Sequence, residues 1–233
     1  MFKLKKIENK DVYYSDILDD FNVEHFFTSR DLIIRENIGL ISKYLKINPD
    51  NLISPNQVHK DNIEIVSENK KEYPDCDGLI LNSCNKAIYL NFADCTPVIL
   101  YDYKSNVASI IHAGWRGTAL EISKKAVLKM KKEFASEPKN IFAIIGPCIS
   151  FERFETSPEA IFALKKTISN ENGLFKDNFA DLKGINKMQL NDVGVNNVDI
   201  CPYCTVLDNN KFFSYRNENK TKNRHSALVK LNI

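Results

Sequence analysis

The chain has 233 residues, and its 43% of hydrophobic residues is enough to bury a sizeable core. Its 32 Lys and Arg nearly balance its 30 Asp and Glu, so it lacks the basic field typical of nucleic-acid-binding proteins, and we expect no nucleic-acid partner. No segment supplies the roughly 18 consecutive apolar residues of a membrane span, and the N-terminus lacks a signal-peptide pattern. We therefore expect a cytoplasmic protein without a membrane partner, whose six cysteines are thiols or ligands rather than disulfides.

No repeat, linker or low-complexity tract divides the chain, which predicts a single domain over residues 1–233. The N-terminal third is the most polar part, with short strands predicted at 12–14 and 25–27 and a helix near 35–46. In the middle of the chain, short runs rich in β-branched residues predict five further strands, at 63–66, 78–81, 87–90, 98–101 and 107–111.

The hydrophobic period changes from strand-like to helical after residues 112–117. Thr118 and Glu121 fit a capping box, which predicts that a helix begins directly after Gly117. The remaining elements are predicted as strands at 141–145, 198–200, 211–215 and 226–231, with helices opening at 157–159 and 181. This mixture predicts an α/β (α+β) fold, in which one layered domain has a mixed sheet and flanking helices.

Two of the four histidines lie at breaks beside the best-defined strands: His59 precedes a strand and His112 ends one. Cys95 lies in a break between two strands, and strand ends commonly deliver side chains into a site. Two His and one Cys suit zinc with an open fourth position, where a metal would activate water. The spacing is unlike that of a zinc finger, so the residues alone leave metal ligation and incidental roles equally open.

Several charged residues near these positions are candidates for catalysis or anion binding. Arg116 and Gly117 lie at the predicted helix start, where free N–H groups favour a phosphate; a surface arginine in a glycine turn is the alternative. Asp94 could orient a ligand or accept a proton. Arg216 and Arg224 could add to an anion site or be solvated loop charges.

Other motifs favour structural roles. Trp115 is expected in the core, and Asp77-Gly78 is equally readable as a turn. Cys148 is expected to be a buried thiol, and the Cys201–Cys204 CxxC motif lacks the context of a redox or zinc site.

Taken together, several segments resemble the YfiH-type laccase-domain family, in the order in which that family has them. They are Gln57-Val58-His59, Asp77-Gly78, Ala93-Asp94-Cys95-Thr96-Pro97-Val98, His112-Ala113-Gly114-Trp115-Arg116-Gly117, Ile145-Gly146-Pro147-Cys148 and Phe212-Phe213-Ser214-Tyr215-Arg216. The resemblance implies a layered α/β fold and a zinc centre on His59, Cys95 and His112. It also implies a purine nucleoside enzyme that phosphorolyses adenosine, inosine and methylthioadenosine and deaminates adenosine.

The family's older description as multicopper polyphenol oxidases conflicts with the histidine count. Four histidines cannot build both a blue-copper site and a three-copper cluster, so copper is expected only as a substitute in the zinc site. The resemblance carries Arg30 over as a substrate-binding residue, although the glycine-rich stretch that usually follows it is missing here. It carries Glu155 over as an acid–base residue, although Phe154 replaces the family's tyrosine before it.

The predicted activity is therefore zinc-dependent phosphorolysis and deamination of purine nucleosides. The residues assigned to catalysis are Cys95, His112, Asp94, Arg116 and Glu155, and those assigned to substrate and phosphate are Arg30, Arg116, Gly117, Arg216 and Arg224. The alternatives are a cysteine hydrolase using Cys95 and His112, or a partner-binding module with a structural metal completed by Cys148 or Asp94. The sequence specifies neither the oligomeric state nor the preferred purine.

Overall fold

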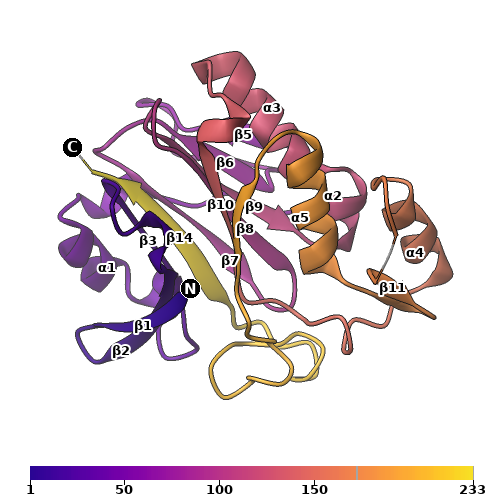
Figure 1. Cartoon of the computed structure of the whole chain (residues 1–233). Coiled ribbons are helices and arrows are strands. Elements are labelled where there is room, and N and C mark those ends of the chain that lie inside the picture. Colours follow the sequence, from indigo (N-terminus) through magenta and orange to yellow (C-terminus); the bar gives the residue numbers. More distant parts are fainter. Residues whose placement is uncertain (172, 233) are drawn as a thin grey trace.

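The structure, a computed structural model, describes residues 1–171 and 173–232. Two six-stranded sheets pack face to face, and helices cover their outer faces (Figure 1). This confirms the layered α+β fold, although the strands form two large sheets where the sequence suggested one. Within the described residues, no helix is long and apolar enough to cross a membrane.

The first sheet combines the N-terminal strands with the last strand of the chain. Its order is β1 (Phe2–Ile7), β2 (Lys10–Ser15), β3 (Val23–Thr28), β14 (His225–Leu231), β7 (Ala87–Phe92) and β4 (Leu52–Ile53). Only the β4–β7 pair is parallel. Helix α1 (Ile38–Leu45) covers the outer face, and the short 3-10 helices η1 (Asp16–Leu18), η2 (Ile34–Glu36) and η3 (Pro49–Asn51) lie in the connections.

The second sheet carries most of the central part of the chain. Its order is β13 (Asn197–Ile200), β10 (Ile141–Ile145), β8 (Thr96–Asp102), β9 (Val107–Ala113), β6 (Gly78–Leu81) and β5 (Ile63–Ile65). Helices α3 (Ile122–Phe134) and α5 (Leu182–Asp192) cover its outer face. The other elements are α2 (Trp115–Ala119), η4 (Pro138–Asn140), α4 (Pro158–Lys165), β11 (Phe175–Lys176) and β12 (Phe179–Ala180).

The central strands bury side chains on both faces, which is why they appear in the sequence as continuous apolar runs. Along β7, Ile88 and Leu90 enter the core between the sheets, whereas Ala87 and Tyr89 pack under α1. Strand β8 alternates in the same way between the inter-sheet core and the core beneath α3. This two-sided packing rigidly fixes the strand ends from which the candidate site is built.

Two predicted elements are wrong. The helix after the glycine turn is split into α2 and α3, and the Thr118 hydroxyl is buried within α2, where it donates to the Ala113 carbonyl oxygen (3.3 Å) and accepts from Asn186 (3.0 Å). It therefore cannot act as the predicted cap, and Glu121 adopts a left-handed conformation between the helices. The strand predicted at 211–215 is a loop in which Phe212 and Phe213 are buried as anchors.

Candidate active site

Strand pairing brings the predicted metal ligands together at one end of the two sheets. Residues 93–95 cross from β7 in the first sheet to β8 in the second. Because β8 pairs antiparallel with β9, Thr96 lies opposite Ala113 and Pro97 opposite His112. Cys95 is thereby placed beside His112. His59 arrives from the connection between β4 and β5 in a left-handed conformation, with φ of 61°.

His59, Cys95 and His112 form one cluster of candidate metal ligands. One ligand atom from each residue lies within 4.8 Å of the other two, and among the described residues no second group of His, Cys and acidic side chains gathers in this way. The two imidazole rings meet edge to face, with centroids 4.6 Å apart. Two nitrogens and one sulfur are a donor set that zinc accepts, so the residues present fit such an ion with a fourth position left open.

The buried carboxylate of Asp77 organises this cluster. Its Oδ1 lies 2.8 Å from His112 Nδ1, which leaves Nε2 of that ring facing the cluster. The same carboxylate accepts the backbone N–H groups of Val58 (3.2 Å), His59 (2.9 Å) and Lys60 (2.8 Å). Burial opposes ionisation of Asp77, but these hydrogen bonds, led by that of His112, outweigh it and lower the pKa of the carboxyl group. One carboxylate therefore orients two of the three candidate ligands.

The surroundings of Cys95 and His112 favour a thiolate–imidazolium pair in the protein without a metal. Burial would raise the pKa of Cys95, but the charge of His112 and hydrogen bonds from His112 and His59 lower it below its ordinary value. Burial lowers the pKa of His112, yet the charge of Cys95 and the hydrogen bond to Asp77 raise it above the ordinary value. The sulfur is thus held in the deprotonated form that a metal or an electrophile requires.

Gly114 lets the backbone pack against this sulfur. A Cβ atom at position 114 would lie 2.9 Å from Cys95 Sγ, closer than such atoms approach each other. Gly114 is also the N-cap of α2, so this short helix begins directly beside the ligand cluster. The helix cap that was predicted at Thr118, after Gly117, thus lies four residues earlier, at the site itself.

The ligand cluster opens into a cavity of about 650 Å³. Its wall combines polar, aromatic and cationic side chains from both sheets and from the loop before β14: Gln57, Val58, His59, Asn91, Ala93, Asp94, Cys95, His112, Trp115, Arg116, Ile149, Phe154, Leu182, Tyr215, Arg216 and Arg224. A cavity of this size accommodates a small organic substrate.

Three arginines reach this cavity from different segments. Arg116 is exposed, and its guanidinium carbon lies 4.3 Å from the ring centroid of Trp115. Arg216 and Arg224 come from the loop between β13 and β14. Trp115 is half-buried in the cavity wall, so it is not the simple core residue that the sequence suggested. The cavity therefore combines an aromatic face with a concentration of positive charge.

Asp94 lies beside Cys95 in a left-handed conformation with φ of 79°, and its carboxylate is occupied by the loop before β14. Oδ1 accepts from the Thr205 hydroxyl (2.6 Å) and Oδ2 from the backbone N–H of Arg216 (2.7 Å). This arrangement supports a positioning role for Asp94 more directly than proton transfer.

Three residues assigned from the sequence lie outside the cavity wall. Gly117 is buried in α2, where a Cβ atom would meet the carbonyl oxygens of His112 and Lys60 at 3.1 and 3.2 Å, so its lack of a side chain serves packing. Glu155 is exposed, and its backbone pairs with Phe179. Arg30 pairs with Glu218 at 3.0 Å and lies over the Phe213 ring. The structure brings none of the three to the ligand cluster.

The remaining histidines and the CxxC cysteines are not members of the ligand cluster. His25 and His225 are buried, and burial lowers their pKa values to about 4 and about 3. Cys201 and Cys204 are buried free thiols, and burial raises the pKa of Cys201 to about 12. Cys148 is likewise buried and free, as predicted.

The sequence did not identify Asp77 and Tyr215 as parts of the site. Asp77-Gly78 has the sequence of a plain turn, and only its place among the motifs shared with the laccase-domain family indicated a role in the site. Tyr215 is carried into the cavity by a loop that the sequence assigned to a strand.

Comparison with known proteins agrees with this architecture. A purine nucleoside phosphorylase of Bacteroides thetaiotaomicron is 32% identical over 200 residues, covering 78% of this chain and 74% of the relative. Adenosine deaminase RL5, from an unknown prokaryotic organism, is 29% identical over 193 residues, covering 76% and 73%. The crystal structure of the hypothetical protein YfiH of Bacillus licheniformis shares the fold, with a TM-score of 0.88 at 23% identity, covering 97% of this chain and 98% of that one.

The sequence profile of the family described as multi-copper polyphenol oxidoreductase laccase matches residues 10–232, nearly the whole chain. The matched region contains all three candidate ligands and every residue of the cavity wall. This protein therefore belongs to the multi-copper polyphenol oxidoreductase laccase family.

Proposed function

We propose that this protein is a zinc-dependent purine nucleoside enzyme that phosphorolyses adenosine, inosine and methylthioadenosine and deaminates adenosine. One observation carries the proposal: three candidate metal ligands and three arginines line the same cavity. The names of the two relatives, a purine nucleoside phosphorylase and an adenosine deaminase, support the choice of substrate.

In phosphorolysis, a phosphate oxygen attacks the ribose C1′, the bond from C1′ to the base breaks, and the base leaves with a proton. Arg116, Arg216 and Arg224 are suited to holding the phosphate, because guanidinium groups pair with its oxygens through two hydrogen bonds at once. The half-buried ring of Trp115 and the ring of Tyr215 offer aromatic faces to the purine.

In deamination, water replaces the amino group of the purine and ammonia leaves. Zinc held by His59, Cys95 and His112 would supply a Lewis acid that activates water in the same cavity. Asp77 keeps His112 in the tautomer that presents Nε2, and Asp94 holds the loop that forms the opposite wall. Both reactions thus use one cavity with different attacking groups.

The test is incubation of the purified protein with adenosine and phosphate, following adenine, ribose 1-phosphate and inosine by chromatography. His112→Ala should abolish turnover and bound zinc, and full activity in that variant would refute the metal assignment. Arg116→Ala should slow phosphorolysis by roughly 10- to 100-fold, the cost of a lost charged hydrogen bond, and affect deamination less. Lys139→Ala, an exposed cation outside the cavity, is the control. Equal losses of both reactions in Arg116→Ala would remove its phosphate role.

The thiolate–imidazolium pair of Cys95 and His112 favours one alternative, a cysteine hydrolase that needs no metal. Removal of metal with a chelator distinguishes the two. In our proposal the metal-free protein is inactive and added zinc restores turnover. Metal-free protein that remains active, and that loses activity when Cys95 is alkylated, would support the hydrolase.

A further inference from the structure

The loop between β13 and β14, residues 201–224, supplies a wall of the cavity without forming a helix or strand in the described structure. It contributes Tyr215, Arg216 and Arg224. A connection of this length without secondary structure is uncommon in a compact protein and is usually functional. In Figure 1 it is the yellow segment that folds back on itself beyond the ends of β7 and β14. Its three cavity residues are useful only if the loop is held in place.

One tie to this loop comes from the residue next to a candidate metal ligand. Asp94, the neighbour of Cys95, accepts hydrogen bonds from Thr205 and from the backbone of Arg216. This tie fixes the loop on the side that faces the candidate ligands.

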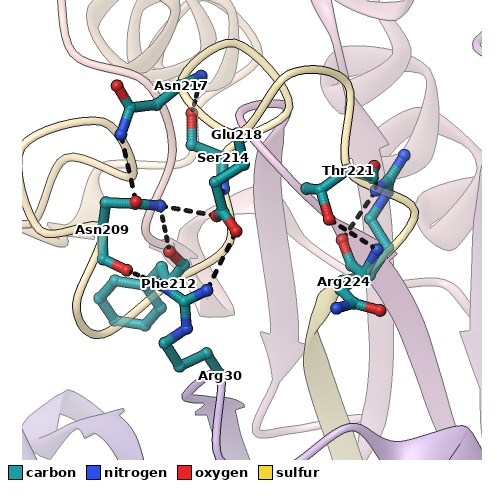
Figure 2. A network of polar contacts seen from close by, with 9 residues as sticks. Arg30, Asn209, Phe212, Ser214, Asn217, Glu218, Thr221 and Arg224 are labelled. Carbon is teal, nitrogen blue, oxygen red and sulfur yellow. Dashed lines mark hydrogen bonds and ion pairs between the residues drawn. The ribbon is translucent and has the colours of Figure 1, made fainter.

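A second tie lies outside the cavity wall. Arg30, two residues after β3, donates through Nη2 to Glu218 Oε2 at 3.0 Å and through Nη1 to the carbonyl oxygen of Asn209. Figure 2 shows this guanidinium between the two ends of the loop segment 209–218. Its guanidinium carbon also lies 4.9 Å from the ring centroid of the buried Phe213. A single side chain from the connection that follows β3 thus contacts three residues of the loop.

Glu218 completes this tie from within the loop. Its Oε1 accepts from the side-chain amide of Asn209 (2.7 Å) and from the backbone N–H of Ser214 (2.9 Å), as Figure 2 shows. The carboxylate therefore closes the turn that carries Tyr215 and Arg216, while Arg30 fixes that closed turn to β3. Both side chains are partly buried, with 31% and 21% exposed, which reduces the solvent screening that weakens surface ion pairs.

We infer that Arg30 and Glu218 form a latch that positions the 209–224 segment as the substrate-binding wall of the cavity. This inference rests on the proposed function, and it assigns Arg30 a positioning role in place of the phosphate contact expected from the sequence. The latch acts on binding, because Tyr215, Arg216 and Arg224 all depend on the position of the segment. Arg30 and Glu218 lie outside the cavity wall and are not among the candidate metal ligands, so turnover of bound substrate should change little.

Two variants remove the latch from either side. Arg30→Met deletes the guanidinium and keeps the apolar contact with Phe213. Glu218→Gln keeps an acceptor for Ser214 and Asn209 and loses the charge facing Arg30. Each should raise KM for nucleoside and for phosphate about tenfold, or about 1.4 kcal/mol, with kcat within about threefold. Zinc content should stay unchanged. Arg30→Lys should recover part of the loss, because lysine keeps the positive charge but lacks the forked guanidinium group that contacts two partners at once.

Amide hydrogen exchange gives a second readout that needs no substrate. Both variants should speed exchange of residues 209–221 about tenfold or more and leave β7 and β9 unchanged. Lys71→Met, which removes an exposed ion pair with Asp50, is the control and should change neither KM nor exchange in the loop. If the protein proves inactive on nucleosides, the proposed function fails, but the amide hydrogen exchange of residues 209–221 still tests whether Arg30 and Glu218 hold the loop.

Two results would overturn the inference. Unchanged exchange in residues 209–221 for both variants would show that the pair does not hold the loop. A rise in KM for phosphate alone in Arg30→Met, without a matching effect of Glu218→Gln, would show that Arg30 binds phosphate directly.

Discussion

The substitution Asp77→Asn tests how the cluster of candidate metal ligands is assembled, because it changes one carboxylate to an amide of the same shape. An amide offers one oxygen where the carboxylate offers two. If that oxygen faces His112 and His59, the N–H groups of Val58 and Lys60 meet an NH₂ group. If the amide is turned around, His112 Nδ1 meets a donor instead. The ring then adopts the other tautomer, in which Nε2 carries a proton and cannot bind a metal.

Either orientation of the amide loses charged hydrogen bonds, each of which contributes about 1.5–3 kcal/mol. Supporting hydrogen bonds of this kind change metal affinity by roughly 10- to 100-fold, equivalent to about 1.4–2.8 kcal/mol. The two magnitudes agree, so we expect zinc affinity to fall within that range while all three ligands remain present.

The measurement is competition for zinc between the protein and a chromophoric chelator, with urea unfolding to verify that the variant folds. Asp75→Asn is the matched control, because it removes an exposed carboxylate two residues away, and asparagine tolerates the left-handed conformation found there (φ of 49°). Zinc affinity of Asp77→Asn within twofold of the parent protein would refute the role given to this carboxylate.

Gly114→Ala places a Cβ atom 2.9 Å from Cys95 Sγ and should weaken zinc binding by about 1–3 kcal/mol, and an unchanged affinity in the same chelator assay would contradict this. Buried His25 should make the fold acid-sensitive, because its pKa is about 4 in the folded protein and about 6.5 in the unfolded chain. The free energy of unfolding should therefore fall as the pH drops through this window, by about 2 kcal/mol at about pH 5. His25→Gln keeps an acceptor for the N–H of Ser15 and should flatten the pH dependence of urea unfolding, whereas the same slope in the variant would exclude His25 as its source. Ser157→Ala removes the capping hydroxyl at the start of α4, which accepts a hydrogen bond from the backbone N–H of Ala160 at 3.2 Å. The loss should lower the free energy of unfolding by about 1 kcal/mol. Altered kinetic constants in this variant would count against a purely local effect.

The grouping of the three candidate metal ligands could be predicted because strand ends and residue types are local features of a sequence. His112 ends a strand, Cys95 lies in the break between two strands and His59 precedes a strand; the antiparallel pairing of β8 and β9 then brings Cys95 and His112 together. The role of Asp77 could not be predicted in this way, because it depends on the pairing of β6 with β9, which places residues 77 and 112 side by side.

Where sequence reasoning failed, tertiary contacts competed with local patterns. Thr118 matches a capping residue by type, but its hydroxyl is used by Ala113 and Asn186. The aromatic run around Phe212 resembles a strand, yet its backbone N–H bonds to Asp208 within the loop. For Arg30, which the resemblance assigned to the substrate, the structure shows a pairing with Glu218, 188 positions away in the chain, that no local pattern predicts.

The position of β14 has a consequence for the order in which the protein can be assembled. This strand lies between β3 and β7, so every strand of the N-terminal hairpins joins the rest of the first sheet through residues 225–231. Until a ribosome has synthesised and released that stretch, one edge of β7 stays unpaired, and such edges promote association between chains. Pairing across so large a sequence separation is also slow. Nascent chains stalled before residue 225 should therefore bind chaperones or aggregate, although all three candidate metal ligands have already been made.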